Sequence, residues 1–465
     1  MFRIKEVVSP TFIEASALVV AIVTIINVSI LQFGSVPHLP ILFSILLLIC
    51  YGLIKKVPYR KLEGGLVDGA GAGMSAVFLF FFIGILVSSW IMSGTIPTLI
   101  YAGFNLITPS FFFAIVFVVT AIVGISIGSS LTTVATVGVA FIGMATMLDL
   151  SLPIAAGAIV SGAFFGDKMS PLSDTTNLAS SIVGVDLFEH IRNMAWTTIP
   201  AFVLSLIIFG LLSPSGTLTD VDKIAYFQEG LLDTGMIHWY TVIPLVVLFA
   251  LTIMKVPALM ALAISSASAI AVSYFHQSFS AVEVFEILFN GFVSTTGIAD
   301  IDALLTRGGM QSMMFTIGLV LLALSMGGLL FTLGIVQCLL GKIESVLKKV
   351  SSVIFASALT AIGINVLIGE QYLSILLTGQ AFQSQYEKVG LAGKNLSRVM
   401  EDAGTVVNPL VPWSVCGIFI SGMLGVATLD YLPFAFFCLL SPILTVLFGF
   451  TGKTLTRLTV EKIKM

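Results

Sequence analysis

Residues 166–179 read Gly-Asp-Lys-Met-Ser-Pro-Leu-Ser-Asp-Thr-Thr-Asn-Leu-Ala, and the interpretation of the chain starts from this polar stretch. It follows a run from Gly69 to Leu148 that has no charged residue and no histidine, and it precedes an apolar run from Asn193 to Thr219. Ionisable groups set in such apolar sequence are costly in lipid unless they face protein or a water-filled cavity. The stretch therefore predicts a functional site within a membrane protein.

The side chains of this stretch are typical of a site for a hard cation. Asp167 and Asp174 supply carboxylates, and Thr175, Thr176 and Asn177 supply neutral oxygens. A proline in the same stretch interrupts the helix and frees backbone carbonyls. Oxygen ligands of these kinds are what Na+ binds in transporters. We therefore expect half of an ion-binding site here.

The composition sets the class of protein. Hydrophobic residues make up 57% of the 465 positions and charged residues only 10%, with a mean hydropathy of +1.10. Soluble domains carry about 25% charged residues. The net charge of −3 says little, because the distribution of charge among the loops matters more. The four cysteines lie far apart without metal-ligand spacing, which favours a packing role.

Apolar segments recur along the chain, and about 20 residues suffice for a helix to span a bilayer. The pattern predicts an all-α polytopic membrane protein with about 12 to 14 transmembrane or re-entrant helical segments. The segments are expected near residues 11–33, 39–54, 74–93, 110–127, 129–148, 152–166, 193–213, 240–254, 256–275, 312–335, 351–369, 371–386, 404–426 and 432–450.

Charged loops suggest an orientation in the cell membrane. The basic loop Lys55–Lys61 is expected in the cytoplasm, the loop 214–238 with its acidic residues outside, and both termini in the cytoplasm. The expected organisation is two N-terminal spans with the basic loop (1–61), a first transport repeat (62–213), an external acidic loop with two linking spans (214–283), a second transport repeat (284–450) and a basic cytoplasmic tail (451–465).

The chain also matches itself. Gly84 and Gly94 correspond to Gly318 and Gly328 at a shift of 234 residues, and residues 128–141 correspond to 369–382 at a shift of 241. Each copy contains five segments, and an odd number inverts the second copy relative to the first. Two inverted-topology repeats with broken helices near the membrane centre form a known transporter architecture.

The second copy holds a partner for the opening stretch. Residues 401–413 read Glu-Asp-Ala-Gly-Thr-Val-Val-Asn-Pro-Leu-Val-Pro-Trp, so Asp402, Thr405 and Asn408 repeat the carboxylate, threonine and asparagine of the first. The prolines make a continuous helix improbable and free carbonyls for a ligand. The alternative is an ordinary loop in which Asp402 caps the following helix.

A single glutamate, Glu370, stands in the apolar run from Val350 to Tyr386. Its counterpart in the first copy is Ser129, next to other hydroxyl residues. We include Glu370 among the candidate site residues, the alternative being a glutamate solvated at the membrane surface.

The motif at 166–179, followed by Glu-His-Ile-Arg at 189–192, resembles the NhaC family of bacterial Na+/H+ antiporters, and residues 401–413 are similar to a second motif of that family. The resemblance covers most of the chain. It implies an inverted-repeat ion-transporter fold and exchange of cytoplasmic Na+ for external H+. The family includes exchangers of malate with lactate coupled to Na+ and H+, and the motifs do not separate the two activities.

The candidate residues suggest a mechanism of competition. Burial of a carboxylate in a dehydrated cavity favours its protonated form, whereas Na+ needs the ionised form. Asp167 and Asp174 are the leading candidates, with Glu370 and Asp402 from the other repeat. Asp174 has the more oxygen-rich neighbours. Lys168 is adjacent to Asp167 in sequence and faces elsewhere on a helix, so a structural salt bridge to another carboxylate is an equal alternative.

Other classes fit less well. An intramembrane aspartyl protease places its aspartates on separate spans in a Gly-x-Gly-Asp setting, whereas Asp167 follows Phe-Phe-Gly. A receptor would not need two matched polar breaks. We expect a secondary transporter and no enzyme, with no cofactor, no nucleic acid, membrane lipid as surroundings and a homodimer as one possibility. The four histidines are expected at the surface, His190 in the motif region being the best exception.

Overall fold

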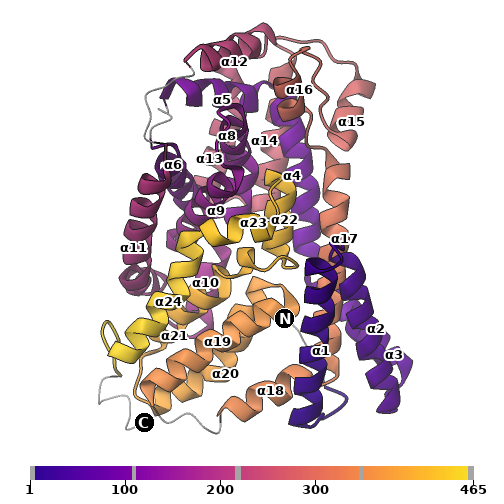
Figure 1. Ribbon diagram of the computed structural model, residues 1–465, viewed down its shortest axis with the longest axis vertical. Coiled ribbons are helices and arrows are strands. Elements are labelled where there is room, and N and C mark those ends of the chain that lie inside the picture. Colours follow the sequence, from indigo (N-terminus) through magenta and orange to yellow (C-terminus); the bar gives the residue numbers. More distant parts are fainter. Residues whose placement is uncertain (1–5, 107–110, 215–220, 345–348, 459–465) are drawn as a thin grey trace.

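The fold is entirely helical over residues 6–106, 111–214, 221–344 and 349–458, which the computed structural model describes (Figure 1). The elements are α1 (Phe12–Leu31), α2 (His38–Ile54), α3 (Tyr59–Ala72), α4 (Met74–Met92), α5 (Thr95–Leu106), α6 (Phe112–Ile127), α7 (Ser130–Thr133), η1 (Val134–Gly138), α8 (Val139–Met147), α9 (Leu152–Met169), α10 (Asp174–Ile182), α11 (Leu187–Leu212), α12 (Val221–Asp233), η2 (Trp239–Val242), α13 (Ile243–Ile253), α14 (Ala258–Ser273), α15 (Ala281–Asn290), α16 (Ala299–Leu305), η3 (Met310–Met313), α17 (Met314–Thr332), α18 (Ile335–Glu344), α19 (Val350–Ile368), α20 (Gln371–Lys388), α21 (Gly393–Val399), η4 (Met400–Thr405), η5 (Asn408–Leu410), α22 (Val415–Leu424), α23 (Thr428–Tyr431), η6 (Leu432–Phe434) and α24 (Phe436–Thr451).

The apolar helices are those of a polytopic membrane protein. Within the described ranges, six are long and apolar enough to cross a bilayer, and two more pairs qualify as spans bent by 45° and 58°. Five shorter apolar helices of 10–17 residues accompany them. The predicted class and the expected 12 to 14 helical segments are therefore confirmed, and both bent pairs lie in the second half of the chain.

The two halves repeat one another at a shift of 241 residues. Gly128 and Gly369 both end a helix in the left-handed conformation, with φ of 69° and 74°. Ser173 and Ser414 both cap the helix that follows a break. The same left-handed glycine and the same capping serine recur 241 residues apart. This is strong evidence of a repeat, because residues in the left-handed conformation are uncommon.

The shift of 234 expected for the first part of the repeat is wrong. The helices α4 and α17 end at Met92 and Thr332, and the left-handed glycines after them are Gly94 and Gly334, with φ of 77° and 67°. The correct shift there is thus 240. The glycine matches at 234 arose because small residues are frequent in helices that pack closely.

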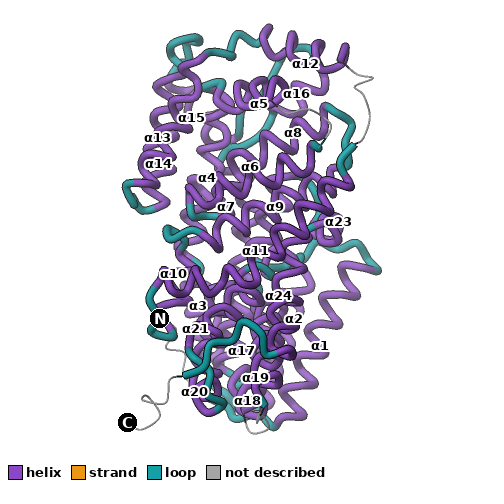
Figure 2. Tube along the Cα trace, turned by 90° about the vertical axis from the view of Figure 1, so that its left-hand side faces the viewer, coloured by secondary structure: helices purple, strands orange, loops and turns teal. Residues whose placement is uncertain are grey.

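The second copy is inverted relative to the first. In Figure 1, α4 leads into α5 at the top of the molecule, whereas its counterpart α17 leads into α18 at the bottom. The view turned by 90° agrees, with α5 and α18 again at opposite ends (Figure 2). The repeats thus run in opposite directions along the long axis, as in inverted-repeat transporters.

The basic segment after α2 is shorter than expected, because α3 begins within it at Tyr59. This helix packs against α17 through glycines: a Cβ on Gly69 would lie 2.3 Å from the carbonyl oxygen of Leu324, and one on Gly328 would lie 2.1 Å from that of Gly65. Glycine is required here because the two backbones touch. The helix was not recognised in the sequence because six of its 14 residues are glycine or alanine, which weakens its apolar periodicity.

A second close contact positions the site. Helices α6 and α9 approach so closely that a Cβ on Gly166 would lie 2.6 Å from the Cα of Gly124, and one on Gly162 would lie 1.9 Å from Oγ1 of Thr120. Gly124 thus lets the two helices touch. This contact fixes the last turn of α9, which carries Asp167 and Lys168, against the segment that continues into α7.

Candidate functional site

Two breaks in the helices hold the candidate residues. The first, Ser170–Ser173, separates α9 from α10, and the second, Val411–Ser414, separates η5 from α22. Each ends in a serine whose hydroxyl accepts a backbone N–H, from Thr176 at 3.4 Å in the first and from Gly417 at 2.9 Å in the second. The expected interruption of both helices is therefore present, and each leaves a new helix N-terminus.

Asp167 lies in the last turn of α9 and is only 5% exposed. Its Oδ2 accepts a hydrogen bond of 2.8 Å from the hydroxyl of Ser130, the first residue of α7. A buried carboxylate held by a hydroxyl donor is poised to bind either a cation or a proton. In the sequence, Ser130 is one of the hydroxyl residues next to Ser129 and has no distinguishing feature of its own.

A cavity of about 420 Å³ opens in front of Asp167. Its polar lining comes from both repeats: Ser129, Ser130, Thr132, Asp167, Asp174, Thr175 and Asn177 from the first, and Gln371 and Tyr372 from the second. Lys255, in the turn between α13 and α14, stands at its edge. Four of the nine residues predicted for the site thus share one cavity.

The polar side chains after the first break have distinct partners. The Thr175 hydroxyl lies 3.0 Å from that of Ser173. Thr176 instead donates to the carbonyl of Lys168, and the amide nitrogen of Asn177 donates to the carbonyl of Ser173 at 2.7 Å. Thr176 and the Asn177 amide nitrogen therefore hold the break together, while Asp174 is exposed to the cavity.

Glu370 caps the next helix of the second repeat. It is 8% exposed, and its Oε2 accepts the N–H of Leu373 at 2.7 Å. The residues that follow it, Gln371 and Tyr372, line the cavity. Its counterpart Ser129 caps α7 in the same way, by accepting the N–H of Thr132. The glutamate therefore lies buried beside the cavity, and the alternative of full solvation does not hold.

A buried ion pair joins the two repeats. The Nζ of Lys168, at the end of α9, pairs with Oδ1 of Asp402 in η4, and both side chains are 0% exposed. The structural salt bridge considered for Lys168 is present. Asp402 therefore neither caps a helix nor lines the cavity with Asp174; it neutralises the one lysine buried between the repeats in the described part of the chain.

The residue before it, Glu401, is fully buried, and neither of its carboxylate oxygens has a hydrogen-bond partner among the described residues. The hydroxyl of Thr405, one turn away, makes no geometric hydrogen bond there either, but it lies close enough to act on the Glu401 carboxyl. Lys168 and Asp167 lie close enough to act on the charge of Glu401. A buried carboxyl without partners is costly as an anion, so it calls for a proton or a cation.

Glu401 and Asp402 lie in a π-helical turn, Met400–Thr405. Such turns are rare and frequent at functional sites, and they turn successive side chains away from α-helical positions. Asp402 stands out in the sequence for its similarity to Asp174, whereas Glu401 does not. Adjacent residues on a helix point in different directions, so Glu401 and Asp402 face different surroundings. Their adjacency in the sequence was the signal that both carboxylates should have been considered.

Asn408 stabilises the second break. Its amide nitrogen donates to Oδ1 of Asn365 at 2.8 Å, and its own Oδ1 accepts the N–H of Cys416 at 3.0 Å. Asn365 in turn donates to the carbonyl of Gly404 at 2.6 Å. This network ties α19, the break and α22 together, so the Asn408 side chain is occupied by protein partners.

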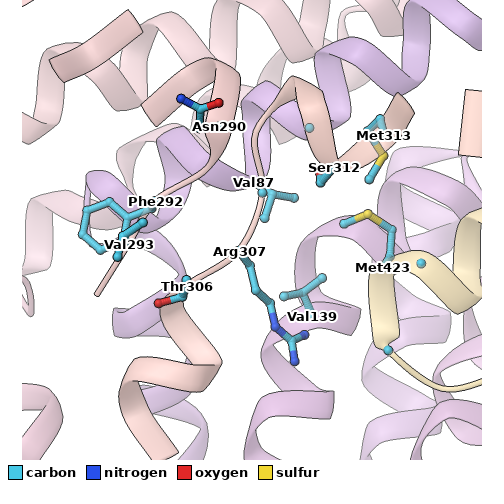
Figure 3. Close-up of a pocket in the computed structure, with 14 residues that line it drawn as sticks. Val87, Val139, Asn290, Phe292, Val293, Thr306, Arg307, Ser312, Met313 and Met423 are labelled. Atoms are coloured by element: carbon cyan, nitrogen blue, oxygen red, sulfur yellow. The ribbon is translucent and has the colours of Figure 1, made fainter. Parts of the chain in front are cut away.

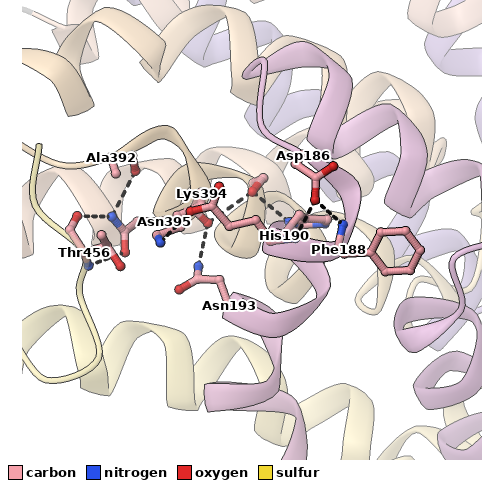
Figure 4. A network of polar contacts seen from close by, with 10 residues as sticks. Asp186, Phe188, His190, Asn193, Ala392, Lys394, Asn395 and Thr456 are labelled. Atoms are coloured by element: carbon pink, nitrogen blue, oxygen red, sulfur yellow. Dashed lines mark hydrogen bonds and ion pairs between the residues drawn. The ribbon is translucent and has the colours of Figure 1, made fainter. Parts of the chain in front are cut away.

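The N-terminal part of α11 docks on α21 beside this site (Figure 4). Asp186 caps α11, the ring Nδ1 of His190 lies 2.8 Å from the Ser397 hydroxyl, and Asn193 donates to the carbonyl of Lys394 at 2.7 Å. His190 is 0% exposed, so it is indeed an exception to the surface position expected for the histidines. Its neighbours in sequence gave no sign of burial because the contacts come from the second repeat.

Another cavity, of about 460 Å³, lies around Arg307 and shares no lining residue with the first (Figure 3). It is bounded by α4, the start of α8 and the C-terminal end of α22. None of the predicted site residues lines it.

Comparison with known proteins now gives the family. A sequence model of the Na+/H+ antiporter family matches residues 162–453, which include both breaks. The chain belongs to the Na+/H+ antiporter family. Within it, the chain is 43% identical to "Na(+)/H(+) antiporter NhaC" of Alkalihalophilus pseudofirmus over 90% of each chain, and 39% identical to the protein of the same name in Bacillus subtilis over 90% of this chain and 93% of that one.

A third relative carries a different name. "Malate-2H(+)/Na(+)-lactate antiporter" of Bacillus subtilis is 33% identical over 97% of this chain and 96% of its own. The resemblance inferred from residues 166–179 and 401–413 is therefore confirmed, and the NhaC relatives are the more similar ones.

Proposed function

We propose that the chain is a secondary antiporter of the cell membrane that exchanges cytoplasmic Na+ for external H+. The observation that carries the proposal is the cavity in front of Asp167, where a buried carboxylate held by Ser130 faces the oxygens of Asp174 and Thr175. The names of the NhaC relatives agree with it.

Na+ and H+ compete at this cavity. The ionised carboxylate of Asp167, supported by the Ser130 hydroxyl, binds Na+ together with Asp174, Thr175 and the Asn177 oxygen. Protonation of Asp167 removes the negative charge that the cation needs. Exchange follows because the two ions cannot occupy the site together, and an empty site with a buried, uncompensated carboxylate is too costly to reorient.

Glu401 and Glu370 are proposed as further proton-holding groups. Glu401 fits this role because both its oxygens are buried without a partner among the described residues. Glu370 fits it less directly, since Leu373 already donates to it. Thr405, beside Glu401, supplies a hydroxyl for a cation or a water molecule.

The pair of Lys168 with Asp402 is proposed as the joint between the two broken helices. The pair carries no net charge, and both of its side chains are buried. It therefore holds the two breaks in a fixed position relative to each other while the ions exchange. Asn408 and Thr176 act in the same structural sense through their contacts with protein atoms.

We further propose the membrane arrangement expected from the loops. Residues 62–213 and 284–450 form the two transport repeats, with both termini in the cytoplasm and the segment 214–283 linking the repeats on the external side. The basic segment Lys55–Lys61 and the apolar outer faces of α1 and α11 suit contact with lipid. A homodimer is compatible with this arrangement.

The alternative is Na+/H+-coupled exchange of small carboxylates such as malate and lactate, which the name of the third relative suggests. The experiment that decides is a proteoliposome assay with a lumenal pH-sensitive dye. An imposed Na+ gradient should drive proton movement in plain buffer, and added malate or lactate should not change the rate.

The test variant is Asp167→Asn, which keeps the size of the side chain and removes its charge. It should insert and fold but show no Na+-driven proton movement. Proton movement that requires malate or lactate would establish the alternative function instead, and full activity of Asp167→Asn would remove this residue from the site.

A further inference from the structure

Arg307 presents a cation to the second cavity without any partner. Its guanidinium is half-buried and makes no hydrogen bond or ion pair with any described residue. No acidic residue lines this cavity of about 460 Å³. A guanidinium withdrawn from water and left unpaired is costly, so its position calls for an anion.

The backbone around Arg307 is held rigidly, so the side chain is placed by the fold. The N–H of Gly309 donates to the carbonyl of Gly84 in α4 at 2.8 Å, and the carbonyl of Arg307 accepts the N–H of Phe292 at 3.1 Å. Gly308 has φ of +85°, and a Cβ on it would lie 2.6 Å from the backbone nitrogen of Ser88. These contacts leave the loop no freedom to withdraw the arginine.

Asp302, which lies in the same region of the sequence as Arg307, is committed to other partners. Asp302 accepts hydrogen bonds from the Ser294 hydroxyl at 2.8 Å, the Thr296 N–H at 2.6 Å and the Gly297 N–H at 3.0 Å. Burial alone lowers the pKa of Arg307 from its usual value, with no carboxylate acting against the shift. The guanidinium therefore remains an uncompensated cation.

The walls opposite the guanidinium are apolar. Figure 3 shows the Arg307 side chain reaching from its loop toward Val139, with Met423 on the adjacent helix and Val87 above. Arginine offers a planar fork that matches a carboxylate in a bidentate way, whereas valine and methionine walls match a hydrocarbon. A cavity of this size suits a small organic molecule.

We propose that the Arg307 cavity binds a small organic carboxylate, with the carboxylate on the guanidinium and a short apolar tail against Val139 and Met423. The site is separate from the cavity of Asp167 and goes beyond the cation exchange proposed above. Because Gly422 and Met423 end α22, which begins at the second break, an occupant touches the far end of a helix that leaves the ion site.

Binding of radiolabelled butyrate to the purified full-length protein in detergent tests the proposal without any ion gradient. We expect saturable binding that unlabelled butyrate displaces. Butylammonium, which has the same tail and the opposite charge, should not displace it, and chloride at equal concentration should not either. These competitions on the wild-type protein decide the question even if a variant fails to fold.

The variants then assign the site. Arg307→Gln should weaken butyrate binding by at least about tenfold, because a charged hydrogen-bonding partner is lost. Arg307→Lys should recover part of it, and Arg60→Gln, at an exposed arginine of α3, should leave it unchanged. Absence of saturable binding, displacement by butylammonium or chloride, or equal affinity of Arg307→Gln would overturn the proposal. Failure of Na+/H+ exchange in proteoliposomes would not bear on it.

Discussion

The buried pair of Lys168 and Asp402 offers the sharpest test of how the repeats are joined. The change is Lys168→Met or Asp402→Asn, alone and combined. Each single variant leaves one charge buried without its partner, whereas the double variant leaves none. Both side chains are 0% exposed, so water cannot compensate the orphaned charge.

The magnitude follows from burial and chain length. Removing one partner of a buried pair costs about 3–5 kcal/mol, and removing both is often close to neutral. With an unfolding entropy of about 2.1 cal/mol/K per residue, 465 residues give about 1 kcal/mol/K. Each single variant should therefore lower Tm by about 3–5 °C, and the double variant by about 1–2 °C.

The assay is thermal unfolding in detergent, read by a dye that fluoresces on reaction with thiols. Cys416 and Cys438 are buried and report unfolding, while Cys50 and Cys338 are replaced by serine to remove background. The control is Glu189→Gln, which breaks the pair of Glu189 with Lys394 at 2.8 Å, where the side chains are 53% and 20% exposed. Its Tm should fall by less than about 1 °C, since exposed pairs contribute little.

The outcome that refutes the reasoning is additivity. If the double variant lost as much Tm as the two single variants together, the lysine and aspartate would act independently. Single variants as stable as the Glu189→Gln control would show that the pair is solvated and does not join the repeats.

The remaining predictions concern packing, the ion site and pH. Gly162→Ala should cost about 1–3 kcal/mol in unfolding free energy because its Cβ would lie 1.9 Å from a hydroxyl of α6, while Gly71→Ala, with nothing within 4 Å, should be neutral by thermal unfolding. Ser130→Ala should weaken Na+ binding by at least about tenfold and Ser130→Thr should restore part of it, measured by Na+-dependent proton release; equal binding would remove the hydroxyl from the site. The hydrogen bond from the Thr296 N–H lowers the pKa of Asp302. The Thr296 N–H should therefore be fully protected from hydrogen exchange above about pH 4 and should lose this protection as the pH falls further and Asp302 is protonated. In Asp302→Asn the protection of the Thr296 N–H should be weak at every pH.

The helices of this fold follow closely from its sequence, for a physical reason. A helix needs about 20 apolar residues to span a bilayer, so the positions of the spans can be read from the local content of apolar residues. Helices outside the expected spans were missed, and they are short or amphipathic and take their stability from neighbours. These are α3, α5, α10, α12, α15, α16, α18 and α21. The repeat register was wrong at Gly84 because glycines are common wherever helices pack closely, and only the backbone conformation of Gly94 and Gly334 identifies the true pair.

The sequence predicted which residues belong to the candidate site, but not which of them contact each other across the two repeats. Asp167 and Asp174 were identified because carboxylates are rare in apolar sequence. Nothing in the chain indicates that Lys168 reaches a residue in the other repeat, because that contact depends on how the two breaks face each other. Glu401 was passed over because its importance lies in the absence of partners among the described residues, which only a structure reveals.

The central claim is that Na+ and H+ compete for the carboxylate of Asp167, and Na+ binding as a function of pH tests it most directly. The binding of radioactive Na+ to the purified protein should weaken by about tenfold for each unit of pH below the titration of the site, as one proton replaces one cation. Asp167→Asn should bind no Na+ at any pH. Na+ affinity that does not change with pH, or full binding by Asp167→Asn, would contradict the account.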